Sequence, residues 1–245
     1  MLFRSLRLFG VGEAAVEQLL REKMNAMTNP TLAPYAKEGE VELRITAKAG
    51  SREEAQSLIA PVEEELRGAL GPLVYGADVP SLEAVVLELL KKHGRTLGCA
   101  ESCTGGLIAK RMTDLPGASA VFRGGVVSYA TQVKHTVLGV PEELLEEYGA
   151  VSDPAARSMA QGAREVLGCD LAVSATGVAG PEADERGNPV GLIFVALSAP
   201  EGTWVRRIQA GGIRERARTL AASHAFDLIR RYLEGLPLEL EELTL

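Results

Sequence analysis

The residues between Gly98 and Gly106 are the ones best suited to chemistry in this chain. They read Gly98-Cys99-Ala100-Glu101-Ser102-Cys103-Thr104-Gly105-Gly106. The pattern predicts a short buried strand that ends at Glu101 and Ser102 and turns sharply into a helix beginning within residues 104–106. The Ser102 hydroxyl would then lie at the carboxyl end of the strand. Beside it would be N–H groups of the first helical turn that have no partner within the helix.

That geometry offers two kinds of chemistry. The N–H groups of Cys103, Thr104, Gly105 and Gly106 are predicted to bind either a phosphate or the oxyanion that forms when Ser102 attacks a carbonyl. The stretch is not the glycine-flanked nucleophile motif of α/β hydrolases, because alanine and threonine stand where that motif has glycines. A structural interpretation, in which Ser102 or Thr104 only caps the helix, has equal weight from this stretch alone.

A lysine follows at a position that suits a base for Ser102. Residues 120–129 are predicted to form a strand that ends at Tyr129, and the next helical turn brings Lys134 to the same edge of the sheet. A lysine acts as a base only when it is neutral. Lowering its pKa from about 10.4 to about 7–8 costs about 4 kcal/mol and requires a dry or cationic environment. A single lysine on a short helix is more often solvated, and His135 and His224 are rival bases.

A third strand end carries small and hydroxyl residues. It reads Ser174-Ala175-Thr176-Gly177-Val178-Ala179-Gly180-Pro181. Thr176 supplies a hydroxyl, and Gly177 and Gly180 allow the backbone to approach a ligand closely. Because open α/β sheets bind ligands at the carboxyl ends of their strands, three such ends predict one shared crevice.

Two arginines at the start of the last helix are candidates for binding an anion. Arg214 and Arg218 are four residues apart, so they share a helix face and suit a phosphate or a carboxylate. The alternative is that these arginines form ordinary ion pairs at the surface, an interpretation that fits Arg216 better than the other two.

The elements that position these residues form two blocks joined by a turn-rich stretch at residues 76–80. In the first block we expect strands at 6–9, 40–48 and 73–75, a helix at 12–25, and a second helix capped by Ser51 with Glu54 in the capping-box position. The second block alternates helices with strands, which predicts a three-layer α/β/α domain. Its expected helices cover 81–94, 131–138, 142–148, a stretch starting at 152–154, and 214–233. Its expected strands cover 96–100, 120–129, 171–175, 190–198 and 204–209. We predict domains at 1–78 and 81–235, followed by an acidic and apolar tail at 236–245.

Composition excludes several classes of protein. The 245 residues are 46% hydrophobic and 24% charged, as in ordinary globular proteins. No apolar stretch approaches the roughly 18 residues of a spanning helix, and the start does not read as a signal peptide, so we expect no membrane association and a cytoplasmic location. The net charge of −7 argues against a broad nucleic-acid footprint. Three cysteines and three scattered histidines predict neither a disulfide framework nor a metal site.

These motifs resemble those of the CinA (competence/damage-inducible) family. The resemblance is carried by Glu101-Ser102-Cys103-Thr104-Gly105-Gly106, by Ser128-Tyr129 with Lys134, and by Thr176-Gly177-Val178-Ala179-Gly180-Pro181. Residues 81–235 are similar to the C-terminal domain of that family, the nicotinamide mononucleotide deamidase (nicotinamide-nucleotide amidohydrolase). The first block, with Leu8-Phe9-Gly10-Val11-Gly12-Glu13 and Pro34-Tyr35-Ala36, resembles the small KH-like α/β middle domain. The N-terminal molybdopterin-binding-like domain of longer relatives has no counterpart in this sequence, so no pyrophosphatase activity is expected.

The resemblance implies a hydrolase of pyridine nucleotide salvage that needs no metal and no cofactor. It would convert nicotinamide mononucleotide and water to nicotinate mononucleotide and ammonia. By family, Ser102 is the nucleophile and Lys134 its base, with Tyr129 and Thr176 in the proton network. The family also favours a homodimer. Arg214 and Arg218 remain our candidates for the nucleotide phosphate.

Two segments depart from the family pattern. Glu182-Ala183-Asp184 follows Gly180-Pro181 where relatives commonly have further glycines, and Gly212-Ile213-Arg214 replaces a frequent Gly-Asp-Arg.

The alternative function is a nucleotide-sensing module whose first block recruits RNA. Residues 1–80 carry 9 basic and 12 acidic side chains, and the G-x-x-G at Gly68-Ala69-Leu70-Gly71 contains no basic residue. Nucleic-acid binding is therefore the weaker expectation.

Overall fold

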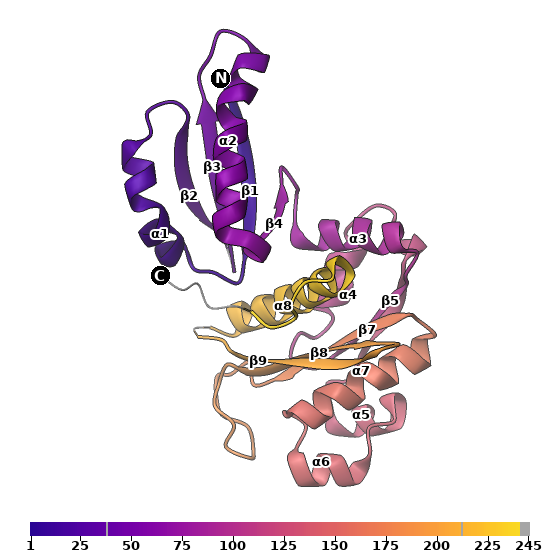
Figure 1. Cartoon of the computed structure of the whole chain (residues 1–245). Coiled ribbons are helices and arrows are strands. Elements are labelled where there is room, and N and C mark those ends of the chain that lie inside the picture. Colours follow the sequence, from indigo (N-terminus) through magenta and orange to yellow (C-terminus); the bar gives the residue numbers. More distant parts are fainter. Residues whose placement is uncertain (38, 212, 241–245) are drawn as a thin grey trace. The chain divides into compact units, whose positions relative to one another are not determined.

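The computed structural model of the chain describes residues 1–37, 39–211 and 213–240. It divides into two compact units, Met1–Val85 and Val86–Glu239, with Leu240 assigned to the first. Each unit has its own sheet (Figure 1). Our domain boundaries at 78 and 81 stay a prediction. Of the predicted tail, residues 236–240 are described, and residues 241–245 lie outside the described part.

The first unit is a four-stranded antiparallel sheet with two helices. Its strands lie in the order β2-β3-β1-β4. They are β1 (Leu2–Phe9), β2 (Thr31–Lys37), β3 (Glu40–Ala47) and β4 (Val74–Ala77), and the helices are α1 (Glu13–Ala26) and α2 (Arg52–Leu70), the latter followed by the 3-10 turn η1 (Gly71–Leu73). Both helices lie against the sheet (Figure 1). Alternate residues of the strands, among them Leu6, Leu43 and Ile45, form the core with the apolar faces of the helices.

Sequence patterns predicted most of this unit and missed one strand. The capping box is confirmed, since the Ser51 hydroxyl accepts a hydrogen bond from the Glu54 N–H at 3.0 Å. Strand β2 was not predicted, because Pro34 in its middle argues against a strand. Proline is tolerated there because β2 is an edge strand, where one row of N–H groups needs no partner. The G-x-x-G of residues 68–71 lies at the end of α2 and not in a loop between two helices.

The second unit is a five-stranded sheet between two layers of helices, in the order β6-β5-β7-β8-β9. Its strands are β5 (Leu97–Glu101), β6 (Phe122–Val127), β7 (Leu171–Gly177), β8 (Leu192–Ala199) and β9 (Gly202–Gln209). Strand β5 runs parallel to β6 and β7, whereas β8 and β9 are antiparallel additions at one side. Helix α3 (Leu82–His93) leads into β5, and η2 (Ala118–Ala120) precedes β6.

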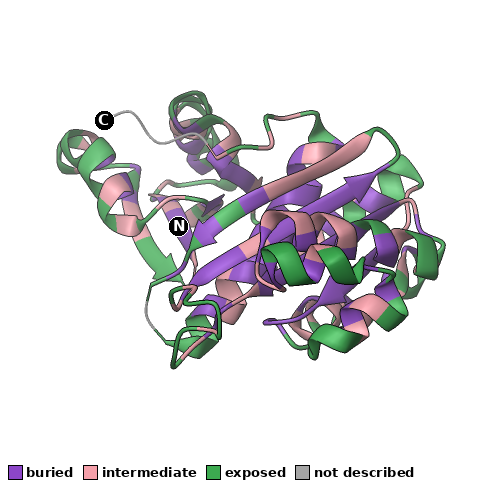
Figure 2. Ribbon diagram, turned by 90° about the horizontal axis from the view of Figure 1, so that it is seen from below, coloured by how far each residue is buried: buried purple, intermediate pink, exposed green. Residues whose placement is uncertain are grey.

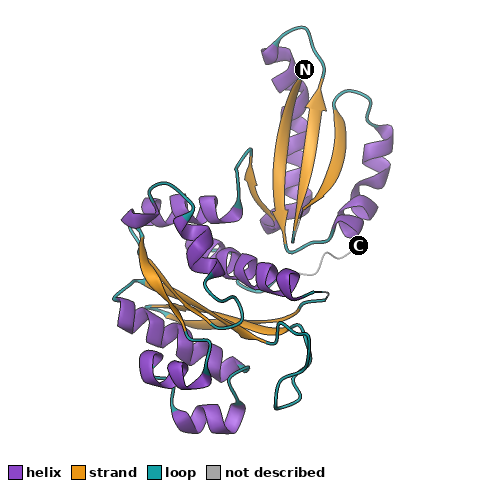
Figure 3. Cartoon of the chain, turned by 180° about the vertical axis from the view of Figure 1, so that it is seen from behind, coloured by secondary structure: helices purple, strands orange, loops and turns teal. Residues whose placement is uncertain are grey.

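Helices cover both faces of this sheet, which confirms the predicted α/β/α sandwich (Figure 3). On one face lie α4 (Leu107–Thr113) and α8 (Arg214–Glu234), and on the other α5 (Thr131–Leu138), α6 (Glu142–Tyr148) and α7 (Asp153–Leu167). All five residues of β5 are buried, as expected for a central strand covered on both sides (Figure 2). No described helix combines the length and the apolar character needed to cross a bilayer.

A close approach between α7 and α5 fixes the position of the helix that carries Lys134. Gly162 of α7 packs against the carbonyl group of Leu138, the last residue of α5. A Cβ atom at Gly162 would lie 1.9 Å from the Leu138 carbonyl oxygen. That oxygen belongs to the backbone, so it moves only if the end of α5 moves with it.

We therefore expect Gly162→Ala to destabilise the second unit by about 1–3 kcal/mol through overpacking. This loss is measured by urea unfolding, followed by tryptophan fluorescence. The chain's single tryptophan, Trp204, lies in β9 of the second unit. The matched control is Gly68→Ala, also within a helix, where the new methyl group meets nothing within 4 Å. Gly68→Ala should raise the free energy of unfolding of the first unit by about 0.5–1 kcal/mol. Circular dichroism measures this change. An unchanged midpoint for Gly162→Ala would contradict the packing argument.

Candidate active site

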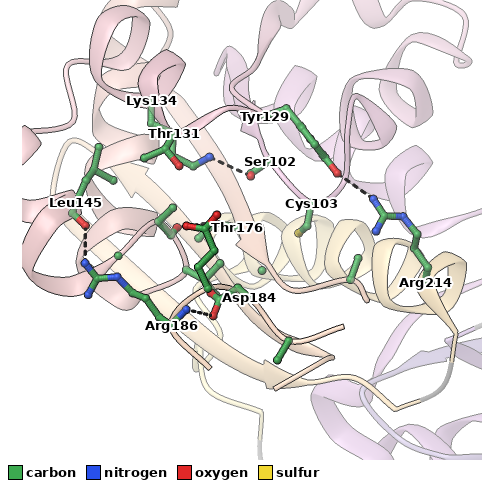
Figure 4. Close-up of a pocket in the computed structure, with 17 residues that line it drawn as sticks. Ser102, Cys103, Tyr129, Thr131, Lys134, Leu145, Thr176, Asp184, Arg186 and Arg214 are labelled. Carbon is green, nitrogen blue, oxygen red and sulfur yellow. Dashed lines mark hydrogen bonds between the residues drawn. The ribbon is translucent and has the colours of Figure 1, made fainter. Parts of the chain in front are cut away.

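Ser102 and Lys134, 32 residues apart in the sequence, meet at the carboxyl end of β5. The Ser102 N–H donates to the Ala175 carbonyl in the neighbouring β7 at 2.9 Å, which fixes the serine just beyond the strand. The Lys134 Nζ lies 3.0 Å from the Ser102 Oγ (Figure 4). It also donates to the Ser128 carbonyl oxygen at 2.7 Å. Ser128 is held in turn by its N–H, which donates to the Glu101 carbonyl at 2.8 Å.

Burial gives Lys134 the pKa that a base requires. Its side chain is 1% exposed, and desolvation lowers its pKa from 10.5 to about 8, with a smaller opposing effect from the Cys103 thiol. Burial also raises the pKa of Cys103 to about 12, so this thiol is neutral at physiological pH and brings no anion to the lysine. No described carboxylate forms a salt bridge with Lys134. A large share of the amine is therefore neutral near pH 8.

The turn after Ser102 differs from the prediction in one respect. Helix α4 begins at Leu107, because Gly105 and Gly106 have φ angles of +59° and +93° and form a turn ahead of it. The buried Glu101 carboxylate accepts a hydrogen bond at 3.0 Å from the Gly106 N–H, one of the four that were expected to face a ligand. It also accepts from the N–H groups of Ile108 at 3.0 Å and Ala109 at 2.8 Å.

The donors available to a ligand are therefore fewer than the sequence indicated. The Gly105 N–H donates to the Ser102 carbonyl at 3.1 Å, and the Gly106 N–H is held by Glu101. The N–H groups of Cys103 and Thr104 donate to no oxygen in the described part of the chain, and both lie beside the Cys103 sulfur, a weak acceptor. These two are the candidates for an oxyanion site beside the Ser102 hydroxyl.

A cavity of about 740 Å³ opens over the serine–lysine pair. Seven predicted site residues line it: Ser102, Cys103, Tyr129, Lys134, Thr176, Gly177 and Arg214. Five others are not among its lining residues: Thr104, Gly105, Gly106, Gly180 and Arg218. The structure thus brings the three predicted strand ends together at one crevice.

Tyr129 and Thr176 line the cavity without bonding to the pair. The Tyr129 hydroxyl accepts a hydrogen bond from Arg214 Nη2 at 3.0 Å (Figure 4). Arg214 Nη1 donates to the Gly180 carbonyl at 2.5 Å. The Thr176 hydroxyl donates to the Ala150 carbonyl at 2.6 Å. Tyr129 thus orients Arg214, and Thr176 is bonded to the backbone of the cavity wall. A role in the proton network therefore stays a prediction for both residues. Gly212 lies outside the described residues.

Arg218 does not share the location of Arg214. Its Nη2 and Nε donate to the Thr104 carbonyl oxygen at 2.7 and 3.3 Å. The guanidinium is therefore bonded to the backbone of the nucleophile turn, and the phosphate role predicted for it has no support from its position.

The loop of residues 183–186 forms one wall of the cavity. The sequence singled out residues 182–184 as a departure from the family pattern next to the substrate, whereas the role of Arg186 was missed. Arg186 extends from this loop to the end of α6 and donates to the Leu145 carbonyl at 3.3 Å (Figure 4). It also donates to the carbonyls of Glu147, at 3.0 Å, and Glu146. Asp184 shapes the loop by accepting from the N–H groups of Arg186 and Asn188. The turn-forming run from Asp184 to Asn188 was the available signal, and it falls where the sequence departs from the family pattern.

The two rival bases lie elsewhere. His135 has its Nδ1 2.9 Å from the Val140 carbonyl oxygen. His224 is buried in α8 beside Arg206, and desolvation together with that positive charge lowers its pKa to about 3. Neither ring forms a hydrogen bond with Ser102 within the described residues, so the Ser–His alternative is wrong.

The second unit is thus an α/β/α domain with a buried serine–lysine pair at its strand ends. The CinA C-terminal domain model matches residues 79–233, and the damage-inducible protein CinA KH domain model matches residues 3–76. The chain belongs to the CinA family.

Similar proteins agree with this assignment. A CinA-like protein of Desulfovibrio desulfuricans is 50% identical over 237 residues, covering 96% of this chain and 56% of that protein. A putative competence-damage inducible protein of Caldanaerobacter subterraneus is 47% identical over 232 residues, covering 95% of this chain and 56% of that protein. The chain spans about half the length of the curated relatives it matches.

Solved structures resemble the second unit. Competence damage-inducible protein A of Klebsiella pneumoniae is 32% identical with a TM-score of 0.61, covering 62% of this chain and 95% of that one. The competence/damage inducible protein CihA of Agrobacterium tumefaciens is 35% identical with a TM-score of 0.60, covering 62% and 93%.

The low pKa of Lys134 predicts how the reactivity of Ser102 depends on pH. Because the neutral amine is the base, the rate of Ser102 labelling by a fluorophosphonate should rise about tenfold per pH unit below about 8 and level off above it. The measurement is labelling rate against pH by mass spectrometry. His135→Gln is the matched control and should leave the curve unchanged, whereas a curve with its midpoint near 6.5 that His135→Gln abolishes would contradict the assignment.

Proposed function

We propose that this protein is a serine–lysine amidohydrolase that converts nicotinamide mononucleotide to nicotinate mononucleotide and ammonia. The observation that carries the proposal is the 3.0 Å contact between the Ser102 hydroxyl and a buried lysine with a lowered pKa, inside a cavity large enough for a mononucleotide. Family membership supports it, since the motifs matched in the sequence are those of the family's deamidase domain. The predicted homodimer stays a prediction.

The reaction begins with acylation of Ser102. The Ser128 carbonyl holds one N–H of the neutral Lys134, which leaves the amine lone pair to accept the Ser102 hydroxyl proton. As that proton moves to Nζ, the Ser102 Oγ forms a bond to the carboxamide carbon. The Cys103 and Thr104 N–H groups stabilise the resulting oxyanion, an interaction for which loss of one donor typically costs roughly 10²–10³ in rate.

The proton taken up by Lys134 is then returned. When the carbon–nitrogen bond breaks, the Lys134 ammonium protonates the departing amine, and ammonia leaves. A water molecule next gives a proton to Lys134 and attacks the acyl-enzyme, and Ser102 regains its proton as the carbon–oxygen bond to it breaks. The base and the acid are the same nitrogen, so its pKa near neutrality serves both steps.

Arg214 is the group in this cavity best placed for the nucleotide phosphate. It lines the same cavity as Ser102 and is exposed, and its contacts with Tyr129 and Gly180 employ only two of its five N–H donors. A guanidinium with free donors pairs with phosphate in a bidentate geometry.

The direct test is ammonia release from nicotinamide mononucleotide in the presence of a chelator. Ser102→Ala and Lys134→Ala should each reduce turnover by about 10³-fold or more, because each removes a group that takes part in bond making. Lys110→Ala is the matched control, since the Lys110 side chain is 67% exposed on α4. Full turnover without Ser102, or none in a folded wild-type protein, would overturn the proposal.

The role of Arg214 has its own test. We expect Arg214→Met to raise the KM for nicotinamide mononucleotide about tenfold or more while kcat changes little, because a phosphate contact made equally in ground and transition states affects binding alone. Steady-state kinetics measure this split. A reduced kcat with an unchanged KM would assign Arg214 to the chemistry and not to the phosphate.

A further inference from the structure

Helix α8 begins with several positively charged side chains, which do not stabilise that end of a helix. Three arginines, Arg214, Arg216 and Arg218, lie among its first five residues. The N-terminal end of a helix carries the positive end of the helix dipole, so cations there are unfavourable. No described carboxylate forms a salt bridge with any of the three. Residues that break a local rule in this way are expected to serve another purpose.

The contacts of Arg218 show what that purpose is. Two of its N–H groups converge on the Thr104 carbonyl oxygen, at 2.7 and 3.3 Å, and link α8 to the turn that follows Ser102. Gly105 packs closely beside it, since a Cβ atom there would lie 3.6 Å from Arg218 Nη2. The guanidinium is half-buried, which makes a charged hydrogen bond to a carbonyl stronger than one at the surface.

Two backbone hydrogen bonds hold the peptide after Thr104, from the Gly105 N–H to the Ser102 carbonyl at 3.1 Å and from the Leu107 N–H to the Thr104 carbonyl at 3.3 Å. In the described chain, the side chains of residues 104–106 add nothing to them. The Thr104 hydroxyl is fully buried, and it has no hydrogen-bond partner in the described chain. Gly105 and Gly106 have no side chains with which to hold the turn. Glu101 anchors only the residues beyond it, from Gly106 to Ala109. The Arg218 contact is therefore the side-chain anchor of the segment that carries the two available N–H donors.

We propose that Arg218 is a positioning residue that holds the Cys103 and Thr104 N–H groups in the orientation that stabilises an oxyanion. The proposal rests on the serine–lysine chemistry proposed above, and it assigns different roles to Arg214 and Arg218. Arg214 faces the cavity and the substrate, whereas Arg218 acts through the backbone of the turn. A misplacement of about 1 Å in such a site can cost about 10²-fold in rate.

The test uses a fluorophosphonate, which reacts with Ser102 whatever the natural substrate is. The Ser102 Oγ forms a bond to phosphorus, the phosphorus–fluorine bond breaks, the hydroxyl proton goes to Lys134 and fluoride leaves. The phosphonyl oxygen takes the place of the oxyanion. We expect Arg218→Met to slow labelling of the full chain by about 10- to 100-fold. Arg218→Lys should recover only part of the rate, because an ammonium cannot reproduce the two-donor contact.

Binding and pH separate positioning from other roles. In the Ser102→Ala background, Arg218→Met should change the Kd for nicotinamide mononucleotide by no more than about twofold. With Ser102 present, the midpoint of labelling rate against pH should stay near pH 8. Arg216→Met, an exposed neighbour on the same helix, is the matched control and should label at the wild-type rate. The melting temperatures of all variants are compared with the wild type.

Two results would overturn the proposal. A Kd raised tenfold or more by Arg218→Met with normal labelling would return Arg218 to phosphate binding. Wild-type labelling and turnover in a folded Arg218→Met protein would show that the turn needs no such anchor. If the wild type labels normally but releases no ammonia from nicotinamide mononucleotide, the proposed substrate fails while the role of Arg218 is still decided by the labelling rates.

Discussion

The proposed chemistry depends on a buried lysine, Lys134, with which no described carboxylate forms an ion pair. Burial lowers the pKa of Lys134 to about 8, and an adjacent aspartate or glutamate would reverse that shift. The Ser128 carbonyl orients the amine in place of an acid. A carbonyl carries only a partial charge, so it directs the nitrogen toward Ser102 without stabilising the ammonium as strongly. Glu101, the acid next to Ser102 in the sequence, has its carboxylate occupied by backbone N–H groups.

The topology of the second sheet brings the reacting groups together. Strand β5 lies between β6 and β7 and runs parallel to both, so all three carboxyl ends lie at one edge. Ser102 follows β5, Ser128 follows β6 and Thr176 lies at the end of β7. Helix α5 starts immediately after the β6 end, which is why a lysine on its first turn reaches the serine. The close contact of Gly162 with Leu138 then fixes the far end of that short helix.

Periodicity was sufficient to predict most helices and strands of the second unit, including α5 and α6, each of which ends at a glycine. The same patterns also placed Ser102, Lys134 and Thr176 at one crevice, since parallel strand ends meet at one edge. Other features depend on long-range contacts that no local pattern encodes. The Glu101 carboxylate takes donors from residues up to eight positions further on, Arg218 reaches a carbonyl 114 residues away, and Pro34 concealed an edge strand.

The loop that forms one wall of the cavity is hydrogen-bonded to α6 through main-chain carbonyls. Arg186 donates to the carbonyls of residues 145–147. Backbone carbonyls are present whatever the residue type, so these bonds constrain position 186 and leave the side chains of residues 145–147 free to change. The residue that ends α6 is not free in this way, because a Cβ atom at Gly149 would lie 2.7 Å from Arg186 Cδ. A side chain at position 149 would therefore displace the arginine and with it this wall of the cavity.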